Sequence, residues 1–368
     1  MAHTTRVSGT SFGSEAAGAN AGTESVIYPS AYDDFEAVDG PWHWCHSESY
    51  QGNPWRVSVT NEVRRLVEAA GHTFEVSDSN GDTAQQINQI RSFIDKDCDV
   101  ITALPGSPTA VNDVIKAAYD AGIPFITGGG SVTSPYAINV DNNFAAWGHD
   151  MMQAIADEFD GEASVLVVEG IAGSPIVAQE WAGAEEVLAE NPGIDIVRKV
   201  NGNWTANVTK NAVLQVLATY PGEIDAVWTT GSESRVVAEA FSEAGRPAPL
   251  ITGSATGDAI GYWKANPEKY RFEGHGVWPH WLAQAMYRVG ARMLDGQHPK
   301  LSSMMLPIPE VSMDGIEGLY EECMTPDAVS VFPIPEADPV PESMIDAFFV
   351  NPAPTPDYDY ASVPGACE

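Results

Sequence analysis

The sequence has few positive charges and no long apolar run. Only 18 of its 368 residues are Lys or Arg, against 51 Asp or Glu, so the formal net charge is -33. This balance opposes binding to nucleic acid and docking on anionic lipid, because both rely on Lys and Arg. No stretch of about 18 apolar residues occurs, so no membrane-spanning helix is expected. An acidic surface favours solubility but identifies no ligand.

The chain also lacks the motifs of several functional classes. It has no HExxH zinc motif, and its Gly-rich stretches GIAGSP and GGG contain neither a Walker lysine nor a complete G-x-G-x-x-G. We interpret both stretches as tight turns between strand and helix, and we expect no enzymatic activity and no cofactor. A transcription repressor would need a basic helix-turn-helix, but residues 1–40 contain one Arg and no Lys.

The N-terminal residues 1–39 are mostly small and polar. They contain no apolar h-region and so do not form a signal peptide as they stand. We expect a disordered leader in this region.

Cysteine is scarce, with four residues that allow three pairings. We predict a disulfide between Cys323 and Cys367, which would fasten the proline-rich C-terminal tail and indicate an oxidising compartment. Cys45 and Cys98 lie at or beside predicted strand starts, and the sequence leaves open whether they pair or are two buried thiols.

What the sequence does have is a regular alternation of short strands and longer helices from Trp42 onward. WHWCHSES is a predicted strand, VSVTNEVRRLVEAAG a predicted helix and HTFEVSDS the next strand. In the following helix Ile87, Ile90 and Ile94 recur at spacings of three and four, which gives one apolar face. The alternation repeats after YAINVDNN and predicts two successive doubly wound α/β units with parallel sheets. From Pro326 the chain is rich in proline and is expected to form an extended arm.

Several stretches resemble the type I periplasmic sugar-binding proteins of ABC transporters, in particular the ribose-binding branch. The resemblance rests on GNPWR, DSNGDTAQQINQI, AAYDAGIPFIT, NVDNN, VVEGIAGSP, DAVWTTG and ITGSATGD, which occur in the order of that family. It implies two α/β lobes joined by three hinge crossings. The N-terminal lobe would be 40–141 plus 278–312, and the C-terminal lobe 142–277, with Asp141 at the first crossing. Residues 313–368 would be a hinge-proximal segment and an extended tail.

The resemblance also implies a function. The chain would be the solute-binding protein of an ABC importer, a monomer that captures a sugar or polyol between its closing lobes and delivers it to a membrane permease. It would be periplasmic or extracellular, with or without a membrane tether. A periplasmic sensor that presents its ligand to a receptor, and a binder of an organic cation, stay open as alternatives.

Ligand-contacting positions follow from the family motifs, together with the rule that ligands bind beyond the carboxyl ends of strands. In NPWR these are Asn53, Trp55 and Arg56, and in GNWT the stacking ring is Trp204. Other positions depart from the family. An expected Asp-Arg pair is Gly129-Gly130 here, and an expected Arg aligns with Glu180. The remaining candidates are Ser232, Glu233, Ser254, Asp258, His275 and Trp278.

Two alternatives concern individual residues. Tryptophans near Glu180, Glu233 and Asp258 could hold an organic cation, although Arg56 argues against one. Whether Arg56 contacts a ligand or pairs with a carboxylate stays open. His43, Cys45 and His46 suggest a metal site, but side chains alternate along a strand and His46 would face the other side. We therefore expect a packed first strand and no metal.

Overall fold

The structure is a computed structural model that describes residues 27–312 and 315–368. Its contacts divide the chain into two compact units. Unit 1 comprises the chain up to Asn142, with Pro279–Leu306 and Asp338–Val363. Unit 2 comprises Asn143–Trp278, Pro307–Ala337 and Pro364–Glu368. The chain therefore passes between the units five times rather than the expected three. The first passage follows Asn142, directly after the predicted hinge residue Asp141.

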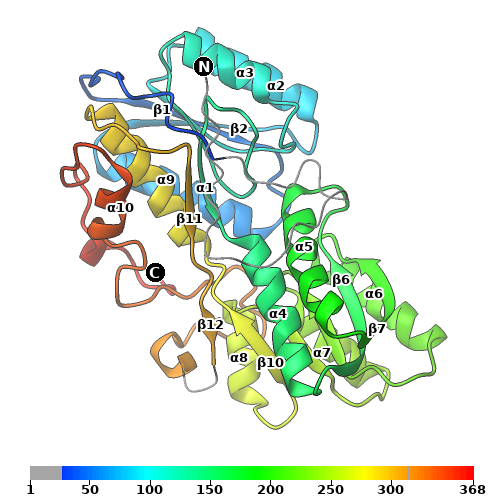
Figure 1. The fold of residues 1–368 in the computed structure, drawn as a ribbon. Coiled ribbons are helices and arrows are strands. Elements are labelled where there is room, and N and C mark those ends of the chain that lie inside the picture. The colour runs from blue at the N-terminus through cyan, green and yellow to red at the C-terminus, as the bar shows by residue number, and fades with distance from the viewer. Residues whose placement is uncertain (1–26, 313–314) are drawn as a thin grey trace. The chain divides into compact units, whose positions relative to one another are not determined.

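Unit 1 is built on a six-stranded parallel sheet with the order β11-β5-β4-β3-β1-β2 (Figure 1). The strands are β1 (His43–Glu48), β2 (Thr73–Asp78), β3 (Val100–Leu104), β4 (Phe125–Thr127), β5 (Ile138–Asn142) and β11 (Ser303–Leu306). The helices of this sheet are α1 (Pro54–Ala69), α2 (Thr83–Asp95), α3 (Asn112–Asp120) and α9 (Pro279–Leu294).

Successive side chains of the first strand point to opposite faces of the sheet and pack in two different cores. Trp44 and Val100 join the core that contains residues of α1 and α9. Their neighbours Cys45 and Ile101 join a second core, with residues of α2 and α3. Cys45 forms a disulfide with Cys98, so its sulfur is not a free thiol. The expectation of a packed first strand agrees with this burial.

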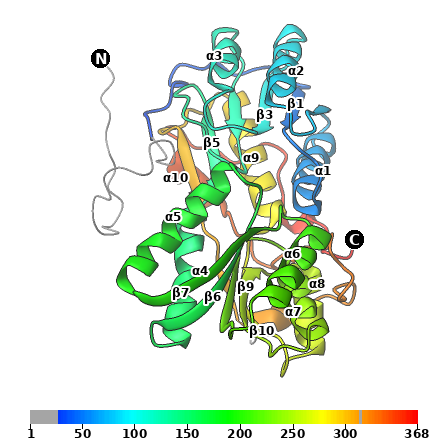
Figure 2. The same ribbon diagram turned by 90° about the vertical axis from the view of Figure 1, so that its right-hand side faces the viewer.

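Unit 2 repeats the architecture with the order β12-β10-β9-β8-β6-β7. Its strands are β6 (Glu162–Glu169), β7 (Gly193–Asn201), β8 (Ala226–Thr229), β9 (Leu250–Ser254), β10 (Arg271–His275) and β12 (Glu310–Val311). Figure 2 shows α4 (Phe144–Glu158) and α5 (Pro175–Glu190) on one face of this sheet. The other face carries α6 (Ala206–Thr219), α7 (Ser234–Glu243) and α8 (Gly257–Ala265). The sheet is parallel except for β12, which runs antiparallel to β10, so these residues belong to unit 2 and not to an N-terminal lobe ending at 312.

The expectation of a disordered leader over 1–39 is wrong for its last part, because residues 27–39 pack on unit 1. Residues 1–26 lie outside the described residues. Pro29 forms an isolated bridge with Leu301, the Tyr32 hydroxyl donates to the carbonyl of Tyr136 at 2.7 Å, and the Val38 amide donates to Leu294 at 2.8 Å. The apolar side chain of Tyr32 lies in the unit 1 core, which explains why this stretch is ordered.

The C-terminal segment is more than an extended arm. It contains the 3₁₀ turns Gly315–Gly318 and Tyr360–Ser362 and the helix α10 (Glu342–Phe348). Arg288 and Arg292, both buried on α9, form ion pairs with Asp338 and with Glu342 and Asp346. The predicted disulfide between Cys323 and Cys367 is present and lies within unit 2. No helix in the described part of the chain is long and apolar enough to cross a membrane.

Two glycines bring α4 and α5 into close contact. A Cβ atom on Gly183 of α5 would overlap the carbonyl oxygen of Ala145, and one on Gly148 of α4 would overlap the carbonyl of Glu180. Backbone therefore packs directly on backbone at this crossing. The contact fixes the height of Glu180 along the sheet, so it positions a candidate ligand residue.

We predict that Gly183→Ala lowers the free energy of unfolding by about 1–3 kcal/mol, because the added methyl group must separate two packed helices. Gly318→Ala is the matched control. That glycine is exposed, no atom lies within 4 Å of the added Cβ position, and its φ does not require glycine. Its unfolding free energy should change by less than about 0.5 kcal/mol. Urea unfolding measures both values, and a Gly183→Ala protein as stable as the wild type would contradict the proposed packing.

Candidate ligand-binding site

The candidate residues fall into two groups, one at the carboxyl edge of each sheet. We call them the unit 1 edge and the unit 2 edge. The unit 1 edge comprises Glu48, Ser49, Asn53, Trp55, Arg56, Ser79, Leu104, Gly129, Gly130, Ser131 and Asp141. The unit 2 edge comprises Gly170, Glu180, Trp204, Thr230, Gly231, Ser232, Glu233, Ser254, Asp258, His275 and Trp278.

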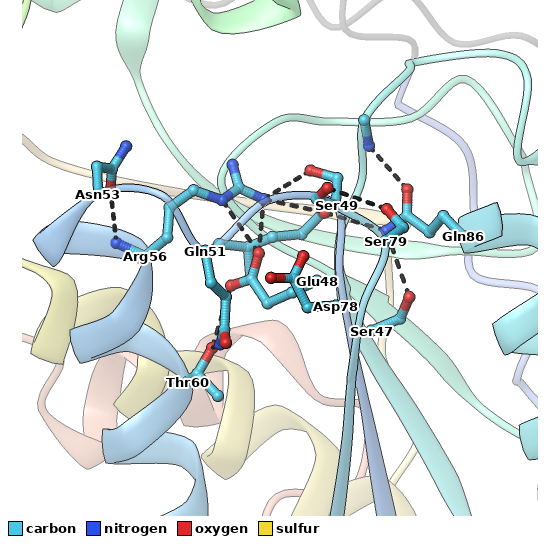
Figure 3. Close-up of polar contacts among 12 residues, drawn as sticks. Ser47, Glu48, Ser49, Gln51, Asn53, Arg56, Thr60, Asp78, Ser79 and Gln86 are labelled. Atoms are coloured by element: carbon cyan, nitrogen blue, oxygen red, sulfur yellow. Dashed lines mark hydrogen bonds and ion pairs between the residues drawn. The ribbon is translucent and has the colours of Figure 1, made fainter. Parts of the chain in front are cut away.

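Arg56 of the unit 1 edge forms an ion pair with Glu48 (Figure 3). Its Nε and Nη2 donate to Glu48 Oε2 at 3.0 and 2.8 Å, and Nη2 also donates to Ser49 Oγ at 2.9 Å and to the Leu104 carbonyl at 3.1 Å. The second oxygen of Glu48 accepts from the Thr60 hydroxyl at 3.1 Å. Because charged hydrogen bonds satisfy both partners, Arg56 acts mainly within this edge. The structure thus shows the carboxylate partner of Arg56, and a contact of Arg56 with a ligand stays a prediction.

Asn53 begins α1 as its N-cap residue. Its side-chain oxygen accepts a hydrogen bond from the Arg56 amide at 3.0 Å, which satisfies one of the free N–H groups of the first turn. Figure 3 shows the amide nitrogen of Asn53 on the side away from this bond. The cap therefore fixes the oxygen and leaves the NH₂ group as the donor that a ligand could use.

Trp55 and Gly129 lie against each other at the unit 1 edge. A Cβ on Gly129 would lie 3.5 Å from the Trp55 ring and 3.1 Å from Leu104, and Gly129 has φ of 60°. Gly130 has φ of 133°, so both positions favour glycine. The Trp55 ring is half-buried and keeps part of its surface accessible.

Asp141 holds this glycine loop in place. Its carboxylate accepts from the Gly130 amide at 3.1 Å and the Ser131 hydroxyl at 3.0 Å, and its other oxygen accepts from the Asn142 amide at 2.9 Å. Burial raises the pKa of Asp141 to about 7, although these hydrogen bonds oppose the rise. The residue expected at the hinge thus links the loop after β4 to the end of β5.

In the unit 2 edge, Trp204 rests on two glycines. A Cβ on Gly170 would overlap the indole ring, and one on Gly231 would lie 2.8 Å from its Cδ1 atom. The indole N–H donates to the Thr230 carbonyl at 3.0 Å. Trp204 has φ of 48°, an uncommon value for a large residue, which marks a locally constrained turn. The ring is half-buried, like that of Trp55.

Two carboxyl groups, those of Glu233 and Asp258, lie near each other at the starts of α7 and α8, and Glu233 lies beside this ring. A Cβ on Gly231 would overlap the carboxyl of Glu233, so Glu233 and Trp204 meet over the same glycine. Burial, and then the nearby Asp258, raise the pKa of Glu233 to about 8. Asp258 itself accepts from Arg235 Nε at 2.9 Å and from the Thr256 hydroxyl at 2.6 Å, so its charge is compensated.

Glu180 reaches the same region from α5 and is fully buried. Burial raises its pKa well above the ordinary value, and the charges of Glu169 and Glu233 raise it further. The Thr230 hydroxyl lies close enough to lower this pKa, but it is outside the geometry of a normal hydrogen bond. Neither carboxyl oxygen of Glu180 has a hydrogen-bond partner among the described residues.

The remaining candidates complete the unit 2 edge. Burial lowers the pKa of His275 to about 4, so its imidazole is neutral. Ser254 is buried, and its hydroxyl has no hydrogen-bond partner in the described part of the chain. Trp278 is buried and donates to the Ala255 carbonyl at 3.0 Å. Ser232 is half-buried where β8 leads into α7.

Sequence reasoning missed the residues that support these side chains. Glu48, the partner of Arg56, lies inside a predicted strand, and nothing in the sequence predicts that Gly170 and Gly231 lie against an aromatic ring. The available signal was position: each of these glycines directly or nearly follows a strand, where an aromatic ring can lie on bare backbone. Pairing Trp204 with them requires knowing that β6 and β8 are neighbours.

Comparison with known proteins agrees with this architecture. Residues 47–298 match the family model described as periplasmic binding protein domain. The chain belongs to this family. The xylitol-binding protein of Mycolicibacterium smegmatis is 27% identical over 177 residues, 48% of this chain and 51% of its own length. The galactofuranose-binding protein of Escherichia coli is 26% identical over 164 residues, 43% of this chain and 52% of its own. The chain thus spans about half the length of these relatives.

Solved structures show the same fold. An ABC transporter solute-binding protein from Thermobispora bispora has a TM-score of 0.69 at 26% identity, covering 75% of this chain and 86% of its own. The Caulobacter myo-inositol binding protein has a TM-score of 0.68 at 17% identity, covering 76% and 97%. The expected fold class, two α/β lobes of the periplasmic binding protein type I kind, is confirmed.

The raised pKa of Glu233 predicts how stability depends on pH. Between the ordinary pKa of 4.5 and the folded value of about 8, the folded state holds a proton that the unfolded state has released. Raising the pH through this window therefore favours unfolding. Glu233→Gln should show a smaller loss of unfolding free energy between pH 5 and pH 8 than the wild type, measured by urea unfolding. The exposed Glu186→Gln, as control, should follow the wild-type slope, and parallel slopes for all three proteins would refute the assignment.

Proposed function

We propose that this protein is the solute-binding component of an ABC importer and that its ligand is a sugar or polyol. The observation that carries the proposal is the pair of half-buried tryptophans, Trp55 and Trp204, each lying on glycine backbone at the carboxyl edge of its own sheet. A flat ring on bare backbone presents an apolar surface suited to the C–H face of a sugar ring. The xylitol and galactofuranose named for two relatives support the same ligand class.

In this proposal both edges contact one ligand. The Asn53 amide and the hydroxyls of Ser232 and Ser254 supply hydrogen bonds, and the two rings cover apolar faces. A ligand that contacts both units favours the conformation in which both contacts form, by its difference in affinity for the two conformations. The conformation with bound ligand is then the one that a permease recognises.

The proposal includes the cellular setting. The membership in a periplasmic binding protein family and the two disulfides both fit an oxidising compartment outside the cytoplasm. The partner is the membrane permease of the importer, and the protein acts as a monomer. Presentation of the same ligand to a receptor would use the same two edges, so a permease-dependent uptake assay distinguishes transport from sensing.

The direct test is a thermal-shift screen of the full chain against pentoses, hexoses, furanose sugars, alditols and inositols, followed by calorimetry. A ligand specific for the folded state adds about 2.7 kcal/mol of stability at a hundredfold excess over its dissociation constant. We expect a clear upward shift with at least one carbohydrate. A panel in which no carbohydrate shifts the midpoint, while another compound class does, would overturn the proposed function.

For the best carbohydrate found, Trp55→Ala and Trp204→Ala should each weaken binding by about 1–3 kcal/mol, because each removes a stacking surface. Tyr320→Ala provides the control, since this ring is also half-buried but lies in the C-terminal segment under Lys264. Circular dichroism would establish that all three variants are folded. Unchanged affinity in both tryptophan variants would mean that these rings do not contact the ligand.

A further inference from the structure

The buried carboxyl groups of the two edges differ in how their charges are balanced. Glu48 in the unit 1 edge has Arg56, and Asp258 in the unit 2 edge has Arg235. Among residues 27–312 and 315–368, no Lys, Arg or His forms an ion pair with Glu180 or with Glu233. Burying a carboxylate without a partner is strongly unfavourable, so two uncompensated groups in one place call for an explanation.

Glu233 lies beside the Trp204 ring, and Glu180 is linked to that ring through Thr230. A Cβ on Gly231 would meet both the Glu233 carboxyl and the Trp204 ring. The indole N–H of Trp204 donates a hydrogen bond to the carbonyl of Thr230, and the hydroxyl of Thr230 lies next to Glu180. Glu180 and Glu233 are near enough for the charge of Glu233 to raise the pKa of Glu180. An aromatic face with two acidic groups at its margin is the arrangement that favours an ammonium group.

Unsatisfied polar atoms mark the same place independently of charge. Both carboxyl oxygens of the fully buried Glu180 lack a hydrogen-bond partner in the described residues, and so does the hydroxyl of buried Ser254. Ser254 ends β9 next to β8, and its amide donates to the Gly231 carbonyl at 2.9 Å. Buried polar atoms normally have partners, so these acceptors indicate that a donor from outside the chain completes them.

The surrounding charges do not already supply that donor. Glu169, which faces Glu180, is paired with Lys199 at 2.8 Å, and Lys199 lies over the ring of Trp181. Arg235 is shared between Asp258 and Glu239. Arg56, the residue that argued against a cationic ligand, belongs to the unit 1 edge and is neutralised by Glu48. Each of these three basic side chains therefore already has an acidic partner.

We propose that the ligand is an amine-bearing sugar or polyol whose ammonium group is bound by Glu180 and Glu233 beside Trp204. This inference rests on the proposed function and specifies its substrate class. The ammonium group donates to the carboxyl oxygens that lack partners, while the hydroxyl-bearing ring of the ligand uses Trp204 and Ser254. A neutral sugar offers hydroxyl donors but no positive charge that would favour the ionised form of these two carboxyl groups.

Binding of an ammonium group should change the protonation of Glu180 and Glu233. Burial raises the pKa of Glu233 to about 8 and that of Glu180 well above its ordinary range, so ionisation of either group is disfavoured in the unliganded protein. An ammonium group favours the carboxylate form and lowers these pKa values, so binding releases protons to the solvent. Affinity should consequently increase as the pH rises from 6 to 8, for as long as the amine of the ligand stays protonated.

The experiment is calorimetry of the full chain with matched probes at pH 7. The pairs are D-glucosamine and D-glucose, D-galactosamine and D-galactose, and N-methylglucamine and sorbitol, with the N-acetylated amino sugars as uncharged analogues. We expect the amine to bind at least tenfold more tightly in one or more pairs, and N-acetylation to remove that gain. Titrations in phosphate and in MOPS, whose ionisation enthalpies differ and neither of which is an amine-bearing polyol, should show net proton release with the amine only.

Substitution of the two carboxyl groups tests whether they cause the preference for an amine over a neutral sugar. Glu180→Gln and Glu233→Gln should each reduce the ratio of amine to neutral affinity by tenfold or more, while Glu186→Gln, an exposed change on the same helix as Glu180, should leave the ratio unchanged. Proton release by the wild-type protein tests the idea even where a variant does not fold.

The outcomes separate the two proposals. Equal or tighter binding of the neutral sugars, without proton release, overturns the amine proposal and leaves the sugar-binding function standing. Binding of ethanolamine or putrescine, with no carbohydrate bound, overturns the sugar-binding function and retains an ammonium site. No binding of any probe counts against both.

Discussion

The need of a buried carboxylate for a partner governs how the functional parts of this chain are arranged. Moving a charged group out of water costs several kcal/mol, and the structure meets that cost in different ways at different places. At the unit 1 edge Glu48 is met by Arg56 and Thr60, and Asp141 is met by backbone amides and a hydroxyl. Each of these groups thereby helps to hold a loop at the unit 1 edge in place.

The same constraint explains the C-terminal segment. Arg288 and Arg292 lie one turn apart on α9 and are almost fully buried. Asp338, Glu342 and Asp346, spaced by four residues, supply the opposing charges. Two buried guanidinium groups would be unfavourable without these acids, so α9 and the segment 338–346 depend on each other. A proline-rich composition predicts an extended arm. This prediction did not consider Arg288 and Arg292, which lie 50 residues before their acidic partners Asp338 and Glu342.

The sequence predicted the order of helices and strands well, because strands that are buried on both faces and helices with one apolar face leave clear periodic signals. It placed Trp204 and Glu233 at the edge of a sheet, because parallel strands all end at the same edge, and the resemblance to the family added Glu180 as a candidate. It could not show that Trp204 lies on Gly170 and Gly231, since that contact depends on β6 lying between β7 and β8. It could not identify Glu48 as the partner of Arg56 either, because Glu48 is part of a buried strand and nothing in the local sequence marks it as an ion-pair partner.

The departures from the family pattern share one feature: they change the charge of the residues around the candidate site. The resemblance led us to expect an acid and a base on the loop after β4, and glycines stand there instead, tied to Asp141. It led us to expect an arginine at the position of Glu180, so the sign of the charge on α5 is reversed. A fold can be kept while a pocket changes, because the strand ends and the glycines under the rings set the geometry and the side chains on the helices set the chemistry. The reversal at Glu180 leaves no arginine there to bind a neutral sugar, and neither Glu180 nor Glu233 has a basic partner among the described residues, whereas Glu48 at the unit 1 edge has Arg56.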